Sequence, residues 1–134
     1  AFTLKEVCDR MLLTQFLVAL AEPLLSPRIF PVVSFLLLGI LAFVTGSNWG
    51  MSAVVTPILL PMCAALGANP VLTMAAIVSG GTFGSHACFY TDATILAANS
   101  AGIDNMEHAI SQLPYVMIAA ILSIVGFLVA GYLM

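Results

Sequence analysis

Asp92 is the acidic residue whose position points most directly to chemistry. No Asp, Glu, Lys or Arg occurs in the 63 residues from Ile29 to Thr91, and the next charged residue after Asp92 is Asp104. A carboxylate at the centre of a bilayer costs at least about 2.5–3.5 kcal/mol, and such residues usually mark ion or proton pathways. Because one carboxylate binds either a proton or a metal ion, Asp92 is a candidate ligand for both, with sodium as the metal. The alternative places Asp92 at a membrane surface, as the N-cap of the next helix.

Hydroxyl groups and one imidazole accompany this acid. Thr91 and Thr94 flank Asp92, and Ser85 and His86 precede it closely. Hydroxyl and free carbonyl oxygens are hard ligands that small cations prefer, and a histidine can relay a proton near pH 7. The residues also have a packing interpretation, in which small side chains let helices approach closely, as in Gly80-x-x-x-Gly84. Under that interpretation, His86 holds a broken backbone in place.

A second polar cluster is Thr45-Gly46-Ser47-Asn48-Trp49-Gly50. Asn48 carries both an acceptor and a donor, and we expect it to line a site together with Thr45 and Ser47. Trp49 fits a cavity wall and a membrane interface equally well. We expect five glycines to break the backbone at the two clusters: Gly46, Gly50, Gly80, Gly81 and Gly84.

The composition identifies the surroundings of these residues. The 134 residues are 62% hydrophobic and 7% charged, with a formal net charge of −3, whereas soluble domains carry about 25% charged residues. The mean hydropathy is +1.15. These values exclude a soluble enzyme domain, a disordered chain and a nucleic-acid binder, which needs a basic stripe. We therefore expect a multi-pass membrane protein whose main partner is the lipid bilayer.

Apolar segments predict the helices that carry the two clusters. They cover residues 29–44, 51–66, 71–83, 93–101 and 114–134, with a polar loop at 102–108. The 71–83 segment is too short for a hydrocarbon core of about 30 Å. In lipid, irregular backbone survives only where it is buried in protein or lines a wet cavity, and paired interruptions point to a transporter's binding site.

The predicted organisation is therefore all-α and polytopic, with discontinuous helices beside full transmembrane helices. We expect residues 1–28 to form an interfacial or re-entrant helix, from about Thr3 to Ala21, and a linker. Residues 29–134 are expected to form a transmembrane transport domain fragment with helix breaks near 45–50 and 84–92. Since the chain begins at Ala1, we interpret it as a piece of a longer protein.

Three ordered motifs resemble those of sodium/proton antiporters of the NhaC type. Residues 45–50 resemble T-G-T-S-W-G, residues 84–96 resemble G-D-H-C-S-P-I-S-D-T-T-I-L, and residues 111–115 resemble T-Q-L-P-Y. The resemblance implies a carrier with inverted repeats, of which this chain is the C-terminal portion, in the bacterial inner membrane. It also carries the family's cation site over to Asp92 and His86, with Thr94 and Gly84 matching. The family's acid before the histidine is Ser85 here, which puts sodium specificity and stoichiometry in doubt.

These observations predict a secondary active transporter fragment that exchanges a cation, sodium, for a proton. The alternative is a sodium- or proton-coupled exchanger of small organic anions or amino acids. We expect no enzyme activity and no cofactor beyond the transported sodium ion and proton. The rival classes are an intramembrane hydrolase, with Ser85 beside His86, and a purely structural membrane subunit. Expected partners are the remaining N-terminal part of the carrier and a second copy in a homodimer.

Overall fold

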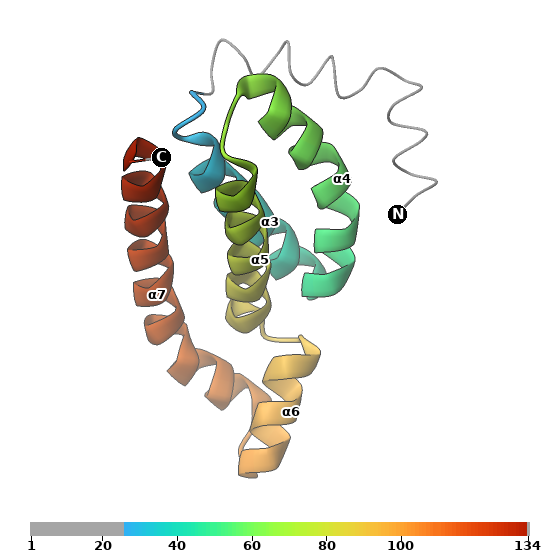
Figure 1. Ribbon diagram of the computed structural model, residues 1–134. Coiled ribbons are helices and arrows are strands. Elements are labelled where there is room, and N and C mark those ends of the chain that lie inside the picture. The colour runs from blue at the N-terminus through green and yellow to red at the C-terminus, as the bar shows by residue number, and fades with distance from the viewer. Residues whose placement is uncertain (1–25, 134) are drawn as a thin grey trace.

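The computed structural model describes residues 26–133, which form helices and contain no strand (Figure 1). The helices are α3 (Phe30–Thr45), α4 (Asn48–Leu66), α5 (Pro70–Ala87), α6 (Asp92–Ala101) and α7 (Asn105–Leu133). The all-α class predicted from the sequence is thereby confirmed for this range. The helix expected between Thr3 and Ala21 lies outside the described residues.

Length and apolarity allow two or three membrane crossings in residues 26–133. α4 and α7 are long and apolar enough to span, and α5 and α6 pass the same test as a pair bent by 48°. At 1.5 Å per residue, the 29 residues of α7 extend for about 44 Å, which exceeds the hydrocarbon core of about 30 Å. The predicted combination of continuous and broken spans is therefore present.

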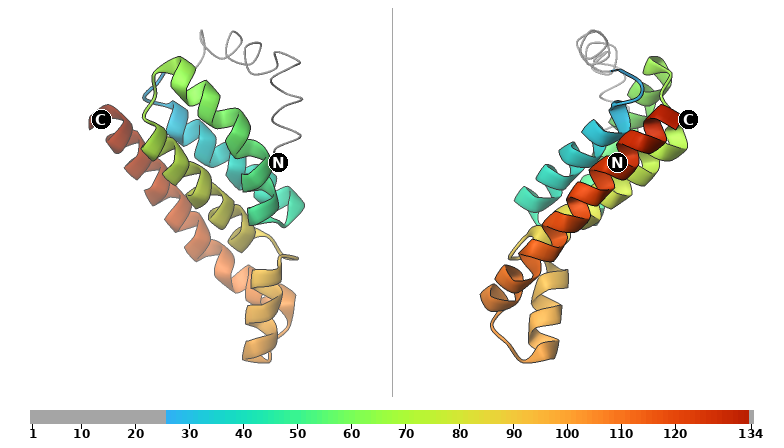
Figure 2. Two further views of the ribbon diagram at one scale, coloured as in Figure 1. Left: turned by 45° about the vertical axis from the view of Figure 1, so that its right-hand side comes forward. Right: turned by 90° about the vertical axis from the view of Figure 1, so that its left-hand side faces the viewer.

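α5 lies at the centre of the bundle, with α3 behind it and α4 and α7 on either side (Figure 1). Figure 2 shows that α7 starts beside α6, with which it forms a hairpin that projects from one end, and then continues beside α5. The broken pair α5–α6 therefore covers the same height as the continuous helix α7. The interruption between them falls part of the way along the bundle.

The packing of α5 against its neighbouring helices corrects the prediction that its glycines break the backbone. Gly80, Gly81 and Gly84 were expected to break the backbone, but all three lie inside α5 and are buried. A Cβ on Gly80 would fall 2.3 Å from the carbonyl oxygen of Phe35. These glycines therefore serve close helix approach, which was the packing alternative. Gly50 likewise lies inside α4.

The boundaries of α5 and α7 differ from the predicted ones. α5 continues to Ala87, so that the interruption is limited to residues 88–91. α7 begins at Asn105 and contains Pro114, which leaves only residues 102–104 of the predicted loop at 102–108. Pro57 and Pro61 lie inside α4, as predicted. The polar residues after Asp104 belong to a helix because Asp104 caps it, with Oδ1 accepting the N–H groups of Met106 and Glu107.

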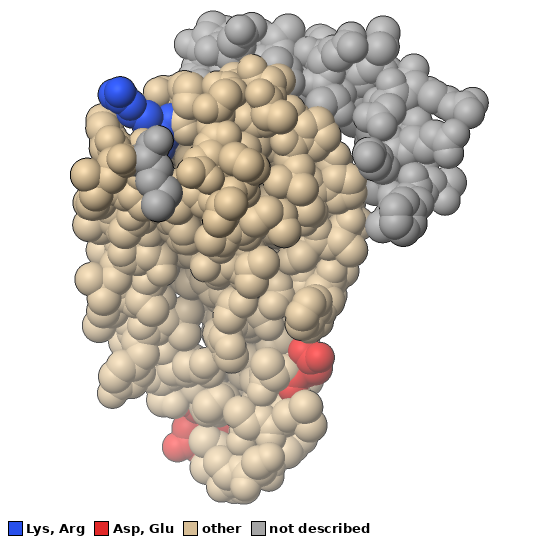
Figure 3. Space-filling view, viewed as in Figure 1, with Lys and Arg blue, Asp and Glu red and all other residues tan. Residues whose placement is uncertain are grey.

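The charged side chains of residues 26–133 separate to opposite ends of the bundle. Figure 3 shows the basic side chain near the start of α3, and the acidic side chains at the end formed by α6 and the start of α7. Arg28 is the single Lys or Arg in this range, and its guanidinium lies 5.4 Å from the ring centre of Tyr132. The surface between the two ends is uncharged, as a bilayer requires.

Candidate functional site

A cavity of about 460 Å³ lies where the two helix interruptions meet. Its wall combines residues from the first cluster with residues from the second. The lining residues are Gly46, Ser47, Asn48, Trp49, Thr82, Ser85, His86, Asp92, Ala93 and Leu96. The cavity therefore joins Asp92, His86 and Ser85 to Ser47 and Asn48, which lie far away in the sequence.

The first interruption consists of Gly46 and Ser47, between α3 and α4. Gly46 ends α3 in the left-handed conformation, with φ +67°, and donates its N–H to the carbonyl of Ala42 at 2.8 Å. Ser47 is the N-cap of α4, and its Oγ accepts the N–H of Gly50 at 3.2 Å. Thr45 lies outside the cavity wall, where its hydroxyl donates to the carbonyl of Leu41. The predicted cluster thus supplies both the turn and part of the wall.

The second interruption is held by two buried threonine side chains. The hydroxyl of Thr91 donates to the carbonyl of Ser85, and that of Thr94 donates to the carbonyl of Cys88, both at 2.9 Å. Thr91 is also the N-cap of α6, where it accepts the N–H of Thr94. Neither threonine lines the cavity. Their hydroxyls satisfy carbonyls that the end of α5 leaves free, as membrane depth demands.

Tyr90 fastens the second interruption to the first. Its hydroxyl contacts the carbonyl oxygens of Phe43, at 3.3 Å, and of Val44, in the last turn of α3. Its ring lies against Gly46, where an added Cβ would fall 2.7 Å from Cε2. The two interruptions therefore form one packed unit.

Asp92 occupies the first position of α6, and its side chain is exposed. Its Oδ1 accepts the N–H of Ala93 at 2.9 Å, and within residues 26–133 no protein donor bonds to the other carboxylate oxygen. The N-cap of α6 is Thr91 and not Asp92, but the Asp92 carboxylate in the first turn stabilises the start of the helix. It also lines the cavity, and its role as a ligand of the cation and the proton stays a prediction. Among residues 26–133, no group of three or more His, Cys, Asp and Glu residues could hold a metal ion.

His86 lies in the last turn of α5 and faces both the cavity and α7. Its Nδ1 is 3.4 Å from Nε2 of Gln112 in α7. Because an amide nitrogen is a donor, Nδ1 is the acceptor in this contact. The contact gives His86 a fixed place at the edge of the candidate site.

Three residues that sequence reasoning left out of the predicted site contribute to it. Thr82 lines the cavity one turn before His86, Gln112 holds the histidine, and Tyr90 joins the interruptions. Four-residue spacing from His86 is a sequence signal for Thr82, and the motif at 111–115 contains Gln112. The position of Tyr90 depends on a contact between distant segments, for which the sequence holds no local signal.

Fold and cavity together define a helical membrane protein whose broken helices meet at a polar site with one carboxylate. A model of the Na+/H+ antiporter family matches residues 1–132. The chain belongs to this family, and the resemblance of its motifs is thereby confirmed.

Three relatives illustrate the range within the family. An uncharacterised protein of Haemophilus influenzae is 31% identical over 137 residues, which cover 98% of this chain and 26% of the relative. An uncharacterised Na(+)/H(+) antiporter of the same organism is 31% identical, over 80% of this chain and 23% of its own length. The malate-2H(+)/Na(+)-lactate antiporter of Bacillus subtilis is 28% identical, over 80% of this chain and 24% of its own length.

The chain therefore spans about a quarter of the length of these curated relatives. No solved structure matches it. Membership of a family of antiporters favours a membrane transporter over an enzyme.

Proposed function

We propose that this chain is the part of a secondary active antiporter that binds the exchanged cation and proton, with Asp92 as the central ligand. The observation that carries the proposal is the cavity shared by both helix interruptions, whose wall contains one carboxylate together with amide and hydroxyl side chains. Oxygen ligands of this kind suit a small hard cation such as sodium. A proton and a cation then compete for the same carboxylate, which is the requirement for exchange.

The charge of the cavity supports a cation rather than an anion as the bound species. Asp92 is the acidic residue in its wall, and none of the lining residues is Lys or Arg. Arg28 lies at the other end of the bundle (Figure 3). A cavity that concentrates negative charge between low-dielectric walls attracts cations and repels anions.

The helix N-termini at the cavity give little support to a bound organic anion. Free N–H groups at such termini are anion sites in many transporters. Here Ser47 accepts the N–H of Gly50 at the start of α4, and Asp92 accepts the N–H of Ala93 at the start of α6. Side chains of the protein thus already accept hydrogen bonds from some of the N–H groups that a bound anion would need.

Exchange of a small organic anion remains the second candidate function, because one relative is a malate-2H(+)/Na(+)-lactate antiporter. In that case sodium or a proton binds at Asp92 as the coupling ion, and residues from the remaining part of the carrier hold the anion. Uptake of labelled malate and lactate into vesicles, with and without sodium, separates the two functions. Sodium-dependent proton flux that needs no organic anion supports the first.

The deciding experiment replaces Asp92 by Asn in the full-length carrier. Asn keeps an oxygen that can accept the N–H of Ala93, so α6 stays capped, while the negative charge is lost. We expect Asp92→Asn to abolish sodium-dependent proton flux in inverted membrane vesicles without reducing the amount of inserted protein. Normal flux in this variant would refute the proposal and would favour a structural subunit.

Asp104→Asn is the matched control. Asp104 is an exposed acid that caps α7, and Asn is an equally good N-cap. The control removes the same charge at a helix start outside the cavity, and we expect it to retain full flux. To test the hydrolase alternative, an active-site serine probe is applied to the carrier, and we expect Ser85 to stay unlabelled.

A further inference from the structure

A row of cavities runs along the line of contact between α5 and α7, which we call the α5–α7 seam. The candidate site shares Thr82 and His86 with a second cavity of about 520 Å³. The second shares Ser79 and Ser123 with a third of about 240 Å³. The third shares Leu72 with a fourth of about 320 Å³.

The row connects the two ends of the bundle. The fourth cavity is lined by Arg28 and Pro31, at the start of α3, and by Leu133 at the end of α7. The candidate site lies at the other end of α5, beside α6 (Figure 1). A path along the seam therefore leads from the end that carries the basic side chain to Asp92.

The wall of the second cavity is mainly apolar in area, but polar groups occur along its whole length. Half of its twelve lining residues carry a hydroxyl, amide or imidazole group. These residues are Ser79, Thr82, His86, Gln112, Tyr115 and Ser123. Interhelical contacts in lipid use small and hydroxyl residues for packing, but packing removes cavities, whereas this seam keeps them.

Gln112 supplies a second, independent observation. Its side-chain Oε1 is buried and has no hydrogen-bond partner, while its Nε2 contacts His86. A buried amide oxygen needs a donor, and a bound water is the usual solution in a polar cavity of sufficient size. The second cavity, which Gln112 lines, offers the room for it.

Gly126 of α7 marks free space in the third cavity. A Cβ added there would meet no atom within 4 Å, whereas one added to Gly131, in the same helix, would fall 2.3 Å from the carbonyl oxygen of Arg28. α7 thus packs tightly against the start of α3 at Gly131 and leaves open space beside α5 at Gly126. A side chain at position 126 can fill the seam without displacing the backbone.

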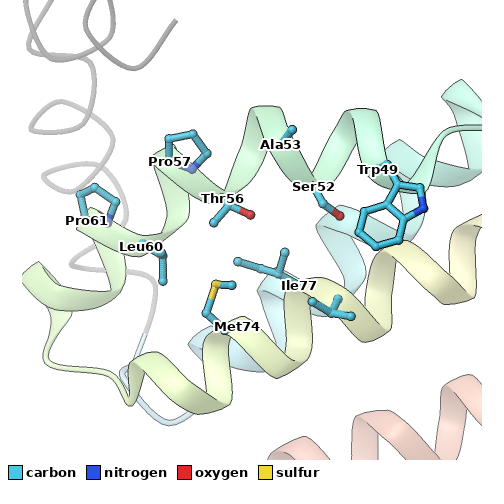
Figure 4. A pocket seen from close by; sticks show the side chains of 10 residues that line it. Trp49, Ser52, Ala53, Thr56, Pro57, Leu60, Pro61, Met74 and Ile77 are labelled. Atoms are coloured by element: carbon cyan, nitrogen blue, oxygen red, sulfur yellow. The ribbon is translucent and has the colours of Figure 1, made fainter. Parts of the chain in front are cut away.

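A fifth cavity, of about 720 Å³, lies on the opposite side of α5 and has a different character. It is lined mainly by apolar side chains of α4 and α5, including Leu60, Pro61, Met74 and Ile77 (Figure 4). Ser52 and Thr56 are the hydroxyl residues in its wall. A smaller share of its lining residues therefore carries polar groups than in the second cavity.

We propose that the α5–α7 seam is the access route by which water and the hydrated cation reach Asp92 from the end of the bundle where α3 begins. The proposal that the cation uses this route rests on the proposed function. The proposal that water fills the route does not. His86 and Gln112 form the inner boundary of the route, since their contact lies where the second cavity meets the candidate site.

Cysteine accessibility in the full-length carrier tests the route. Ser79→Cys and Ser123→Cys are treated with a positively charged, membrane-impermeant methanethiosulfonate, applied to right-side-out and to inverted vesicles. Ser26→Cys and Ser100→Cys, at exposed positions near the two ends, identify which face is which. Leu122→Cys, on the outer surface of α7 and 67% exposed, is the lipid-facing control.

We expect both seam cysteines to react from the same face as Ser26→Cys, and Leu122→Cys to stay unreactive. The native Cys63 and Cys88 are fully buried, and labelling of the parent carrier gives the background. Absence of seam labelling, or labelling from the face of Ser100→Cys, would overturn the proposal.

Filling the seam at Gly126 provides the second test. We expect Gly126→Leu to slow labelling of Ser79→Cys at least tenfold and to slow exchange, while Gly126→Ala leaves both close to normal. Val129→Leu, on the exposed outer surface of α7, is the control for a leucine at a position of the same helix outside the seam. Unchanged labelling in Gly126→Leu would contradict the route.

The two proposals fail in distinguishable ways. Seam labelling that persists in the Asp92→Asn background supports the route even without exchange. Normal exchange by Asp92→Asn refutes the cation site, while the labelling data still decide on the route.

Discussion

Gly84 of α5 lies so close to Gly39 of α3 that a Cβ on Gly84 would fall 2.2 Å from the carbonyl oxygen of Gly39. The Cβ added to Gly84 would also lie 2.8 Å from the Cβ of Ala42. This contact brings the end of α3 against the end of α5, and with them the two helix interruptions. The candidate site therefore depends on helix packing as much as on its own polar residues.

We predict that Gly84→Ala destabilises the carrier. Backbone cannot yield as a flexible side chain does, so the added methyl group must push α3 and α5 apart. Overpacking of this kind costs about 1–3 kcal/mol. The measurement is the thermal unfolding of purified full-length carrier in detergent, with Gly126→Ala as control because its Cβ meets nothing within 4 Å. Equal melting temperatures for the two variants would contradict the close contact.

A second prediction concerns Gly46, which carries both a conformational and a steric requirement. Its φ of +67° disfavours any side chain, and a Cβ would also strike the ring of Tyr90 at 2.7 Å. The left-handed conformation alone costs about 1–2 kcal/mol. We expect Gly46→Ala to destabilise the carrier by more than this conformational cost. We also expect it to reduce exchange, because Tyr90 must leave its position between the interruptions.

Gly102 separates the two contributions. It has a nearly identical φ of +69°, but nothing lies within 4 Å of its Cβ position. Gly102→Ala should therefore lower the melting temperature only by the amount that the left-handed backbone conformation causes, and it should leave exchange intact. If Gly102→Ala and Gly46→Ala behave alike, the packing of Tyr90 against Gly46 contributes nothing.

The sequence predicted most of the helices because their signals are local. The proline at residue 70 fits a helix start, and the αL cap at Gly46 follows from the glycine itself. The isolation of Asp92 in an uncharged sequence is likewise visible without a structure. Such features need no knowledge of which helices pack together.

The features that sequence reasoning missed depend on contacts between distant segments. A glycine pair in an apolar segment can break a helix or let a neighbour approach, and only the position of Phe35 and Gly39 decides in favour of approach. Similarly, Thr91 and Thr94 look like cation ligands until the free carbonyls of Ser85 and Cys88 are placed beside them. The role of the glycines follows from the packing of α3 on α5, and that of the threonines from the geometry of the turn between α5 and α6.

A third prediction tests the threonines that hold the second interruption. Thr94→Val keeps the shape of the side chain but leaves the carbonyl of Cys88 without its donor. A buried polar group deprived of its partner costs about 1–3 kcal/mol, and we expect a corresponding loss of thermal stability together with reduced exchange. Thr94→Ser restores the donor and should recover both. Failure of Ser to rescue would mean that the methyl group, not the hydrogen bond, matters at this position.

The last prediction concerns Asn48, which brings the first interruption into the cation site. Its Oδ1 lies against Gly81, whose added Cβ would be 2.1 Å away, and it also contacts the hydroxyl of Ser52 at 3.4 Å. Because Asn48 belongs to the cavity wall, removing its amide group should weaken cation binding at the proposed site while Asp92 still exchanges protons. We expect Asn48→Ala to raise the sodium concentration for half-maximal proton flux by about tenfold, equivalent to about 1.4 kcal/mol, with a smaller effect on the maximal rate. Asn99→Ala, at an exposed position of α6 outside the cavity, is the control and should leave the sodium dependence unchanged. An unchanged sodium dependence in Asn48→Ala would exclude the first interruption from the cation site, leaving Asp92 to act with the residues of the second interruption alone.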